Sequence, residues 1–247
     1  MNILVCIAQA PDTTAKISFT DNNTKFNDQG VTFIINPYDE WYALVRALEL
    51  KEAGKAAEVH LVTVGNASTE AVMRKALALG GDQAFRINTE SVDTYEIAAQ
   101  IAAFAKDKGY ELILAGKESI DYNNASTGAA IAGALGCNYV GFATHLDIDG
   151  STVKLKREIE GGEEEDSAVL PLVVSCQKGM AEARIPNMRG IMAARTKPLK
   201  VVEAVPADTL TAIVRFELPP PKAGVKLVPA DNPAELVRLL HEEAKVI

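Results

Sequence analysis

Short apolar runs alternate with segments of helical periodicity through the first half of the chain. The runs Ile3–Ile7, Val59–Val64, Ala84–Ile87 and Leu112–Ala115 are too short for helices and are typical of strands buried on both faces. Segments with apolar residues at helical spacing follow them. This alternation predicts an α/β fold with a mostly parallel sheet, right-handed crossovers and helices on both faces, which is a three-layer α/β/α arrangement.

Cap and stop residues predict where these helices begin and end. Asn36 should cap the first helix with Pro37 at its first position, and Ser68 or Thr69 should cap the second. The four expected helices lie at about residues 37–54, 68–79, 95–108 and 127–135. A small hairpin is expected at residues 16–26, with its turn at Asp21–Asn23.

The pattern changes after Thr144. Thr152–Glu158 alternates like a strand with one wet face, and Gly161–Asp166 reads as an acidic turn. Pro171–Cys176 is again apolar and extended, whereas residues 178–198 have no useful periodicity. The second half is therefore expected to depart from simple strand–helix alternation.

A proline-rich segment separates the domain, residues 1–205, from the C-terminal residues 206–247. Pro206 and Pro219–Pro221 exclude helix and central strand there, and Asn232 with Pro233 then begins a last amphipathic helix. Two interpretations are open from this pattern alone. The segment is either an arm that packs on another molecule, or a terminal helix folded onto its own domain.

Composition narrows the class of protein. Of the 247 residues, 48% are apolar, and the net charge is 25 − 33 = −8, which disfavours nucleic-acid binding. No apolar run approaches the roughly 20 residues of a membrane span, so no direct membrane insertion and no signal peptide are expected. Three widely spaced cysteines indicate reduced thiols and a cytoplasmic location, and the three histidines have no metal-ligand spacing.

Candidate chemistry lies at the carboxyl ends of the expected strands, where open parallel sheets bind ligands. Cys6–Pro11, Val64–Asn66 and Gly116–Gly128 are such ends, and Ser126 and Thr127 begin a helix whose free N–H groups favour a phosphate. Simple helix capping explains the same residues. The GxGxxG, GxxxxGK[ST] and GxSxG motifs are absent, and no catalytic residues are predicted.

A basic and apolar segment at Arg184–Arg195 stands out in this acidic chain. Its arginines alternate with methionine and isoleucine, which are residue types used at protein interfaces. The segment predicts a docking site, with an irregular loop that closes the core as the alternative. The residues assigned to partner recognition are Arg184, Met188, Arg189, Ile191, Met192 and Arg195.

Together these pieces resemble the electron transfer flavoprotein beta-subunit family along nearly the whole chain. The most specific match is Lys156–Gly162 followed by Leu170–Pro171, in which Arg-Glu-x-Glu-Gly-Gly precedes Leu-Pro. The other matching pieces, in order, are Ile3–Ile7 with Pro11–Asp12, Ile35–Pro37, Arg74–Gly80, Ala115–Lys117 with Ser119–Asp121, Ile185–Asn187 with Ile191–Met192, and Ala223–Lys226.

The resemblance implies a fold of the adenine nucleotide alpha hydrolase type and a non-enzymatic electron carrier. It implies a heterodimer with an alpha subunit, which holds most of the redox FAD and on which the C-terminal arm packs. Acyl-CoA dehydrogenases of fatty acid beta-oxidation and related flavoenzymes would supply electrons, and a membrane quinone reductase would accept them. The segment 184–195 corresponds to the loop that anchors the dehydrogenase, with Met188 where a leucine is usual.

The resemblance also implies a structural AMP in this chain. The matching positions are Cys6, Asn36, Pro37, Tyr38, Asp39, Val64, Gly116, Lys117, Ile120, Asp121, Tyr122, Asn123, Asn124, Ala125, Ser126 and Thr127. Tyr122, Asn123, Ala125 and Ser126 depart from the common pattern of this loop. Two alternatives stay open: an electron-bifurcating relative with a second FAD in the same pocket, and a nucleotide-binding module without electron transfer.

Overall fold

The computed structural model describes residues 1–222 and 224–247, so Ala223 of the matching block 223–226 lies outside the described residues. The strands are β1 (Asn2–Cys6), β2 (Gln9–Pro11), β3 (Phe19–Thr20), β4 (Lys25–Phe26), β5 (Phe33–Ile35), β6 (Glu58–Val64), β7 (Gln83–Asn88), β8 (Tyr110–Gly116), β9 (Asn138–Asp149), β10 (Thr152–Ile159), β11 (Gly162–Val169), β12 (Leu172–Cys176) and β13 (Leu199–Glu203). The helices are α1 (Asp39–Glu52), α2 (Glu70–Leu79), α3 (Thr94–Ala105), α4 (Thr127–Leu135), α5 (Met188–Ala194) and α6 (Pro233–Arg238). A 3₁₀ turn η1 (Ala67–Thr69) precedes α2, and a π-helical turn η2 (Leu239–Ala244) follows α6.

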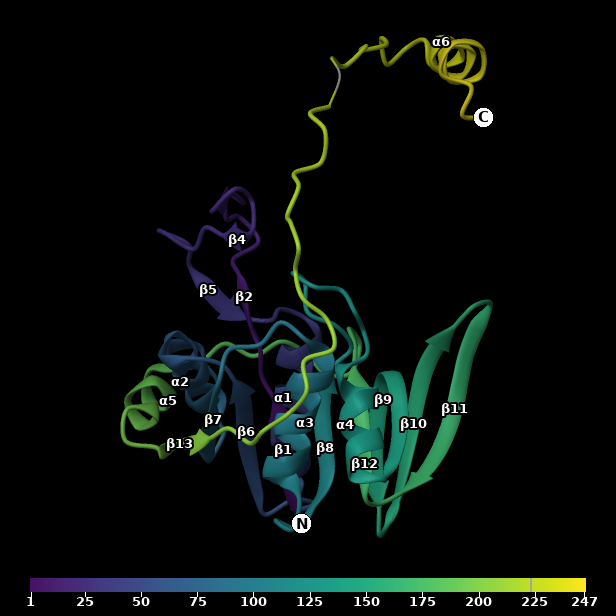
Figure 1. The fold of residues 1–247 in the computed structure, drawn as a ribbon. Coiled ribbons are helices and arrows are strands. Elements are labelled where there is room, and N and C mark those ends of the chain that lie inside the picture. The colour runs from purple at the N-terminus through teal and green to yellow at the C-terminus, as the bar shows by residue number, and fades with distance from the viewer. Residues whose placement is uncertain (223) are drawn as a thin grey trace.

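One large sheet organises the domain, in the strand order β11-β10-β9-β12-β8-β1-β6-β7-β13. The strands from β9 to β13 in this order are parallel, and β10 and β11 extend one edge as an antiparallel hairpin (Figure 1). The chain moves from β1 to β6 and β7 on one side, then returns to β8 on the other side of β1. The strand order therefore reverses between β1 and β8, which is the usual position of a ligand site in such sheets.

Helices cover both faces of this sheet, which confirms the predicted three-layer α/β fold. Ile3 and Val5 of β1 belong to the core formed with α1 and α2, whereas Leu4 and Cys6 pack with α3 and α4. This division follows from the alternation of side chains along a strand. Because β1 is buried on both faces, its sequence is continuously apolar.

Two sequence expectations in the second half were wrong. The acidic residues Glu163–Asp166 lie within strand β11 and not in a turn, because cations of β10 pair with them: Lys156 Nζ lies 2.9 Å from Glu163 and 3.0 Å from Glu165. Helix α5 forms inside the supposedly irregular segment 178–198. The expected departure from strand–helix alternation is confirmed, because β9, β10, β11 and β12 follow one another with no helix between them; it begins with β9, and Thr144 lies in the middle of that strand.

The predicted hairpin and the proline-rich segment are confirmed as local structure. Asp21, Asn22 and Asn23 all have positive φ, between 52° and 65°, in the turn between β3 and β4. After β13 the chain has no helix or strand in its described residues until α6, and Figure 1 shows it extending far from the sheet. Within the described residues, no helix has the length and apolar character needed to cross a bilayer.

Candidate functional site

The loops that follow β1 and β8 meet where the strand order reverses, and Asn36 joins them. Its buried side chain donates from Nδ2 to the Glu118 carbonyl oxygen at 2.8 Å, and its Oδ1 accepts from the Ile120 N–H at 3.0 Å. Asn36 therefore pins the loop 116–127 to the segment before α1. The expected capping role was wrong: α1 begins at Asp39, and Asn36 makes long-range contacts instead.

Tyr38 adopts a strained backbone conformation directly before α1. Its φ is 66° and its ψ is −82°, and the Asp39 N–H donates to the Pro37 carbonyl at 2.9 Å. These values describe the rare γ-turn with positive φ at its central residue. Such conformations cost roughly 1–3 kcal/mol and cluster at ligand sites. The turn places Pro37 and Asp39 on either side of an exposed tyrosine ring.

The first turn of α1 places two carboxyl groups, those of Asp39 and Glu40, beside the loops that follow β8 and β1. The Asp39 carboxylate accepts from the Glu118 N–H at 3.2 Å, and buried Glu40 accepts from the Ala8 N–H at 2.5 Å. Burial raises the pKa of both groups, and for Glu40 the neighbouring carboxylates of Asp121 and Asp39 raise it further. Glu40 thus ties the end of β1 to α1. The sequence pattern does not indicate this role, because acidic residues are common in the first turn of a helix.

Gly116, the last residue of β8, allows α1 to approach the sheet closely. A Cβ at this position would lie 2.6 Å from Cγ of Glu40 and 3.2 Å from its backbone nitrogen. The next residue, Lys117, donates its N–H to the Cys176 carbonyl at 2.8 Å, and its ammonium group pairs with Glu118 at 2.8 Å. The strand end, the helix start and the loop are therefore packed as one unit.

The rest of the loop leads into an uncapped helix start. Asn123 and Ala125 have positive φ values of 50° and 49°, and Asn124 donates to the Thr94 hydroxyl. Ser126 occupies the N-cap position of α4, but its side chain makes no capping hydrogen bond, and the first turn holds no acidic residue. The first N–H groups of α4 are thus left without a side-chain acceptor, which suits an anionic ligand.

Cys6 and Val64 end the neighbouring strands β1 and β6. The Cys6 thiol is buried, and burial raises its pKa, so it is an apolar support and not a reactive thiolate. Gln9 donates from Nε2 to the Ser68 hydroxyl at 3.2 Å and so links the loops after these two strands. The predicted residues thus lie at the carboxyl-terminal end of the sheet, at or after the ends of β1, β6 and β8 and on the segment 36–39 between β5 and α1.

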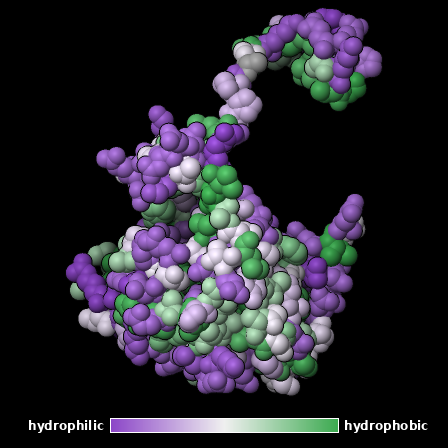
Figure 2. Space-filling view, in the orientation of Figure 1, coloured by the Kyte–Doolittle hydropathy of each residue, from purple (hydrophilic) through white to green (hydrophobic). Residues whose placement is uncertain are grey.

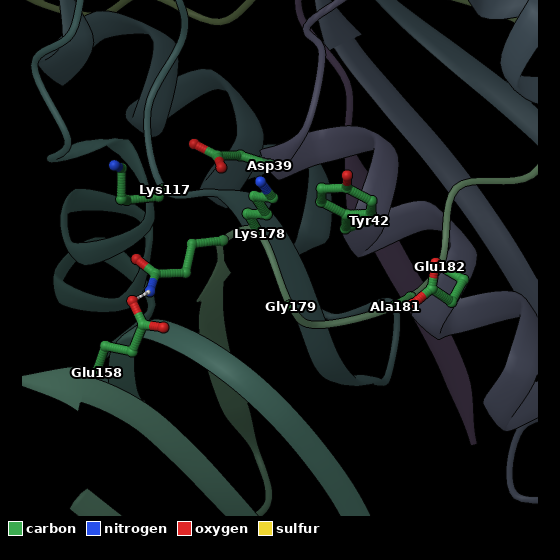
Figure 3. Close-up of a pocket in the computed structure, with 9 residues that line it drawn as sticks. Asp39, Tyr42, Lys117, Glu158, Lys178, Gly179, Ala181 and Glu182 are labelled. Carbon is green, nitrogen blue, oxygen red and sulfur yellow. Dashed lines mark hydrogen bonds between the residues drawn. The ribbon is translucent and has the colours of Figure 1, made fainter. Parts of the chain in front are cut away.

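A cavity of about 600 Å³ lies at this end of the sheet, beside the carboxyl ends of β8 and β12 (Figure 3). Among the predicted site residues only Asp39 and Lys117 line it. The sequence interpretation missed the others, which are Tyr42, Glu158, Gln177, Lys178, Gly179, Ala181 and Glu182. The signal was present, because Pro171–Cys176 was expected to be extended and Gln177 follows its end. On one wall of the cavity, the Gln177 side chain donates from Nε2 to the Glu158 carboxylate at 3.3 Å.

The predicted recognition segment is a short helix on the domain surface, with its apolar residues outward. The Asn187 side chain caps α5 by accepting from the Gly190 N–H at 2.8 Å. Met188 is 72% exposed and Met192 is 65% exposed, and Ile191 is also exposed. Ile185, which the sequence interpretation left out, is 89% exposed. An outward apolar cluster of this kind is typical of an interaction site.

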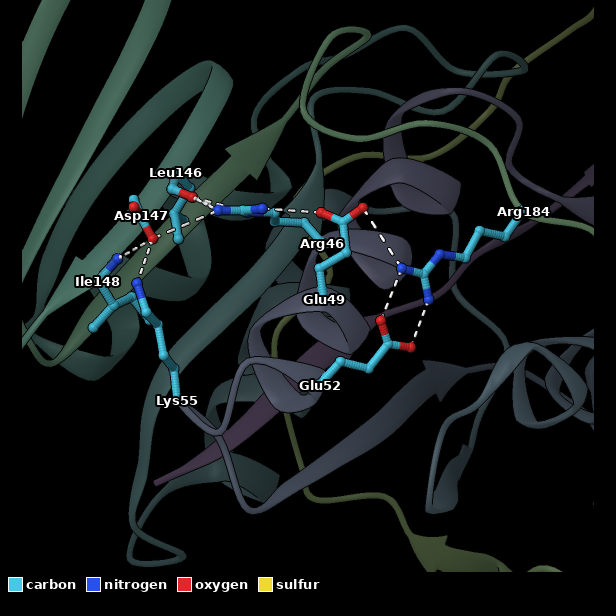
Figure 4. A network of polar contacts seen from close by, with 8 residues as sticks. All are labelled: Arg46, Glu49, Glu52, Lys55, Leu146, Asp147, Ile148 and Arg184. Atoms are coloured by element: carbon cyan, nitrogen blue, oxygen red, sulfur yellow. Dashed lines mark hydrogen bonds and ion pairs between the residues drawn. The ribbon is translucent and has the colours of Figure 1, made fainter.

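Arg184 supports this segment from beneath. Its guanidinium makes a two-pronged contact with Glu52 of α1, at 2.7 and 2.9 Å, and lies 3.7 Å from Glu49 (Figure 4). The Trp41 indole N–H donates to the Arg184 carbonyl at 3.1 Å. From the other side, Arg74 donates to the carbonyls of Ala194 and Lys197 at 2.8 and 2.7 Å. Arg184 therefore positions the segment, whereas Arg189 and Arg195 are exposed.

The fold defines a class: a doubly wound α/β protein whose strand order reverses between β1 and β8, with a short helix, α5, that exposes apolar side chains. A model of the family described as "Electron transfer flavoprotein domain" matches residues 23–207. The chain is 38% identical to the electron transfer flavoprotein subunit beta of Bacillus subtilis, with both chains covered completely. It is 36% identical to that of Syntrophomonas wolfei, over 99% of this chain and 96% of the relative.

A third relative, the subunit beta of Bradyrhizobium diazoefficiens, is 32% identical over the full length of both chains. The chain therefore belongs to the electron transfer flavoprotein family, as a beta subunit, which is an electron-carrier subunit.

Proposed function

We propose that this chain pairs with an alpha subunit and shuttles electrons from acyl-CoA dehydrogenases and related flavoenzymes to a membrane quinone reductase. In this proposal the alpha subunit holds most of the FAD, and this cytoplasmic chain holds a structural AMP. The domain 1–205 carries the nucleotide and the recognition segment 184–195, and residues 206–247 are the arm that packs on the alpha subunit. Full-length similarity to beta subunits supports the assignment.

One observation carries the nucleotide part of the proposal. The uncapped N-terminus of α4 follows directly on the loop 116–127, which Asn36 holds at the switch point of the sheet. A phosphate would find backbone N–H donors there. Asp39 and Asp121 offer acceptors for the hydroxyl and amino groups of a nucleoside. The donor and acceptor set at this edge therefore fits AMP.

Replacing Thr127 with leucine tests this site. Thr127 is the first residue of α4, so a bulky apolar side chain there should displace the phosphate from the helix start. We expect nucleotide content to fall about tenfold in the purified heterodimer, because a charge-assisted hydrogen bond is worth about 1.5–3 kcal/mol. Acid release followed by chromatography and mass spectrometry measures it. Thr24→Leu in the exposed hairpin is the control and should retain the nucleotide.

The same measurement separates the alternatives. Release of AMP from this chain, together with a single FAD per heterodimer, would support the proposed role as an electron carrier. Two FAD molecules per heterodimer would overturn the AMP assignment in favour of an electron-bifurcating protein. A nucleotide with no yellow partner subunit after co-purification would indicate a binding module without electron transfer.

Met188→Ala tests the dehydrogenase-docking role of the recognition segment. Because the side chain is exposed, its loss should weaken docking and leave the core intact. We expect the apparent KM of the dehydrogenase for this carrier to rise about tenfold, as for the loss of roughly 1.4 kcal/mol of contact energy. FAD content, AMP content and the melting temperature should not change. A variant that melts several degrees lower yet transfers electrons normally would show that Met188 is a packing residue.

A further inference from the structure

Residues 205–216, which we call the strap, cross helix α3 before the chain leaves the domain. Figure 1 shows this yellow-green segment running from the end of β13 over α3 toward the loops at the carboxyl ends of the strands. Although the strap has no regular secondary structure, the domain holds it at four points. These are Val205, Thr209, Thr211 and Phe216.

The first anchor is a buried amide on α3. Gln100 is 3% exposed, and its Nε2 donates to the Val205 carbonyl at 2.6 Å while its Oε1 accepts from the Val205 N–H at 2.9 Å. One side chain thus satisfies both backbone groups of Val205, as a neighbouring strand would do. One turn away on α3, Glu96 accepts from the Thr209 hydroxyl at 2.8 Å.

The second anchor is the N-cap of the same helix. Asp93 Oδ1 accepts from the Glu96 N–H at 2.8 Å, while Oδ2 accepts from the Thr211 N–H at 2.8 Å and from the Thr211 hydroxyl at 2.5 Å. The hydrogen bonds from Thr211 and from the helix hold the pKa of Asp93 below its ordinary value. A single buried carboxylate therefore caps α3 and fastens the strap.

The last anchor lies on the hairpin. The Phe216 N–H donates to the Asn23 carbonyl at 2.7 Å, and its ring stacks on Phe19 with centroids 4.8 Å apart. Beyond Phe216, the described residues make no hydrogen bond to residues 1–205; Glu217 pairs with Arg215 of the strap, and Lys226 bonds to Glu243. The chain thus becomes free of the domain after residue 216.

The strap also carries uncovered apolar side chains. Leu210, Val214 and, just beyond the strap, Leu218 are 65%, 85% and 59% exposed. None of them is an anchored position, and Figure 2 shows hydrophobic residues gathered where this chain leaves the body. The domain therefore fixes polar groups of the strap and the Phe216 ring, and it leaves Leu210 and Val214 uncovered.

We propose that the strap aims the arm at the alpha subunit and that Asp93 is its positioning residue. This inference rests on the proposed pairing with an alpha subunit. A chain segment that is already ordered loses less conformational entropy on binding, so fixing residues 205–216 beforehand strengthens association. It also sets the direction from which residues 217–247 depart. The alpha subunit would cover Leu210, Val214 and Leu218.

Asp93→Asn separates the two roles of the carboxylate. Asparagine caps helices as well as aspartate does, so α3 keeps its acceptor for the Glu96 N–H. In the variant an NH₂ group replaces Oδ2 and faces the Thr211 N–H, and two hydrogen-bond donors cannot bond to each other. We expect the dissociation constant of the full-length heterodimer to rise about three- to tenfold, as for the loss of one or two hydrogen bonds. The melting temperature of the free chain should hardly change.

Thr211→Val removes only the hydroxyl and should act in the same direction with a smaller effect. Thr196→Val is the matched control, because its hydroxyl bonds locally to the Ala193 carbonyl at 3.2 Å. Hydrogen–deuterium exchange of the full chain reports on the strap itself. Wild-type residues 205–216 should exchange more slowly than residues 224–232, and Asp93→Asn should reduce this difference, most of all around Thr211.

Three results would overturn the inference. The first is a wild-type strap that exchanges as fast as the arm. The second is a strap released in both variants with no loss of affinity for the alpha subunit. The third is a wild-type chain that pairs with no alpha subunit, which would also refute the proposed function. The first two results would refute the strap inference while leaving the pairing with an alpha subunit intact. Slow exchange of the strap in a chain that pairs with no alpha subunit would instead show that the proposed function is wrong.

Discussion

A chain that ends at Pro219 should lose its alpha subunit while keeping its fold. In the described residues, no hydrogen bond joins residues 220–247 to the domain, so their removal should leave the melting temperature unchanged. The deleted arm contains Val225 and Leu227, which are 83% and 87% exposed, and the apolar face of α6. Burying such side chains contributes roughly 1.5–3 kcal/mol each. We therefore expect heterodimer affinity to fall at least about 100-fold, which corresponds to roughly 2.8 kcal/mol.

A full-length control distinguishes lost apolar contacts from lost chain length. The double variant Val225→Ser and Leu227→Ser keeps all 247 residues and should lose an intermediate part of the affinity. Analytical ultracentrifugation of both proteins with the alpha subunit measures the effect. AMP content serves as the internal reference, because in the described residues no hydrogen bond joins the deleted segment to the loop 116–127 or to α4. Unchanged pairing of the shortened chain would show that the arm does not bind the alpha subunit.

The central strands could be predicted because burial on both faces requires a recognisable composition. β1, β6 and β8 are parallel strands between two helical layers, so nearly every position of Ile3–Cys6, Val59–Thr63 and Leu112–Gly116 is buried. The candidate site follows from the same reasoning and stays a prediction, since the order of strands and helices determines where their carboxyl ends meet. Periodicity alone was sufficient for this part of the fold.

Elements that depend on long-range partners could not be predicted. Strand β11 is acidic and pairs with β10. Two cations of β10 contact its carboxylates: Lys156 pairs with Glu163, and Arg157 lies 3.4 Å from Glu164. Helix α5 is seven residues long and forms where Arg74 and Asn187 satisfy its ends. Local propensity carries little information about such contacts, because the stabilising partners lie elsewhere in the sequence.

Asn36 illustrates the same limit within the site. Asn before Pro is a strong helix-start signal, and local rules favour a cap. The structure uses both polar atoms of its side chain for a loop 82 and 84 residues away. Glu40 was missed for a related reason, because only the close approach of Gly116 to α1 shows that this carboxyl group is buried at the switch point. Sequence reasoning thus predicted a candidate site but not the contacts that hold its segments together.

Gly190→Ala should displace helix α5 of the recognition segment as a whole. A Cβ on Gly190 would lie 2.3 Å from the backbone oxygen of Ala78 at the end of α2, and a backbone atom there cannot move as a side chain can. Helix α5 would have to shift away from α2, which would strain the hydrogen bond from Arg74 to Ala194. Because Met188, Ile191 and Met192 move with the helix, we expect a larger loss of docking than for Met188→Ala, with the apparent KM of the dehydrogenase raised about 30-fold, or roughly 2 kcal/mol.

Gly133→Ala is the matched control for this substitution. Gly133 lies in α4, where nothing approaches an added Cβ within 4 Å, so alanine should stabilise the chain by about 0.5–1 kcal/mol. In Gly190→Ala the melting temperature should fall by a few degrees, while heterodimer affinity and AMP content remain at the wild-type level. Steady-state electron transfer over a range of carrier concentrations, together with thermal melts, measures both variants. If Gly190→Ala lowers the melting temperature but leaves the KM unchanged, the position of α5 does not govern docking, and residues 184–195 cannot be the surface that the dehydrogenase recognises.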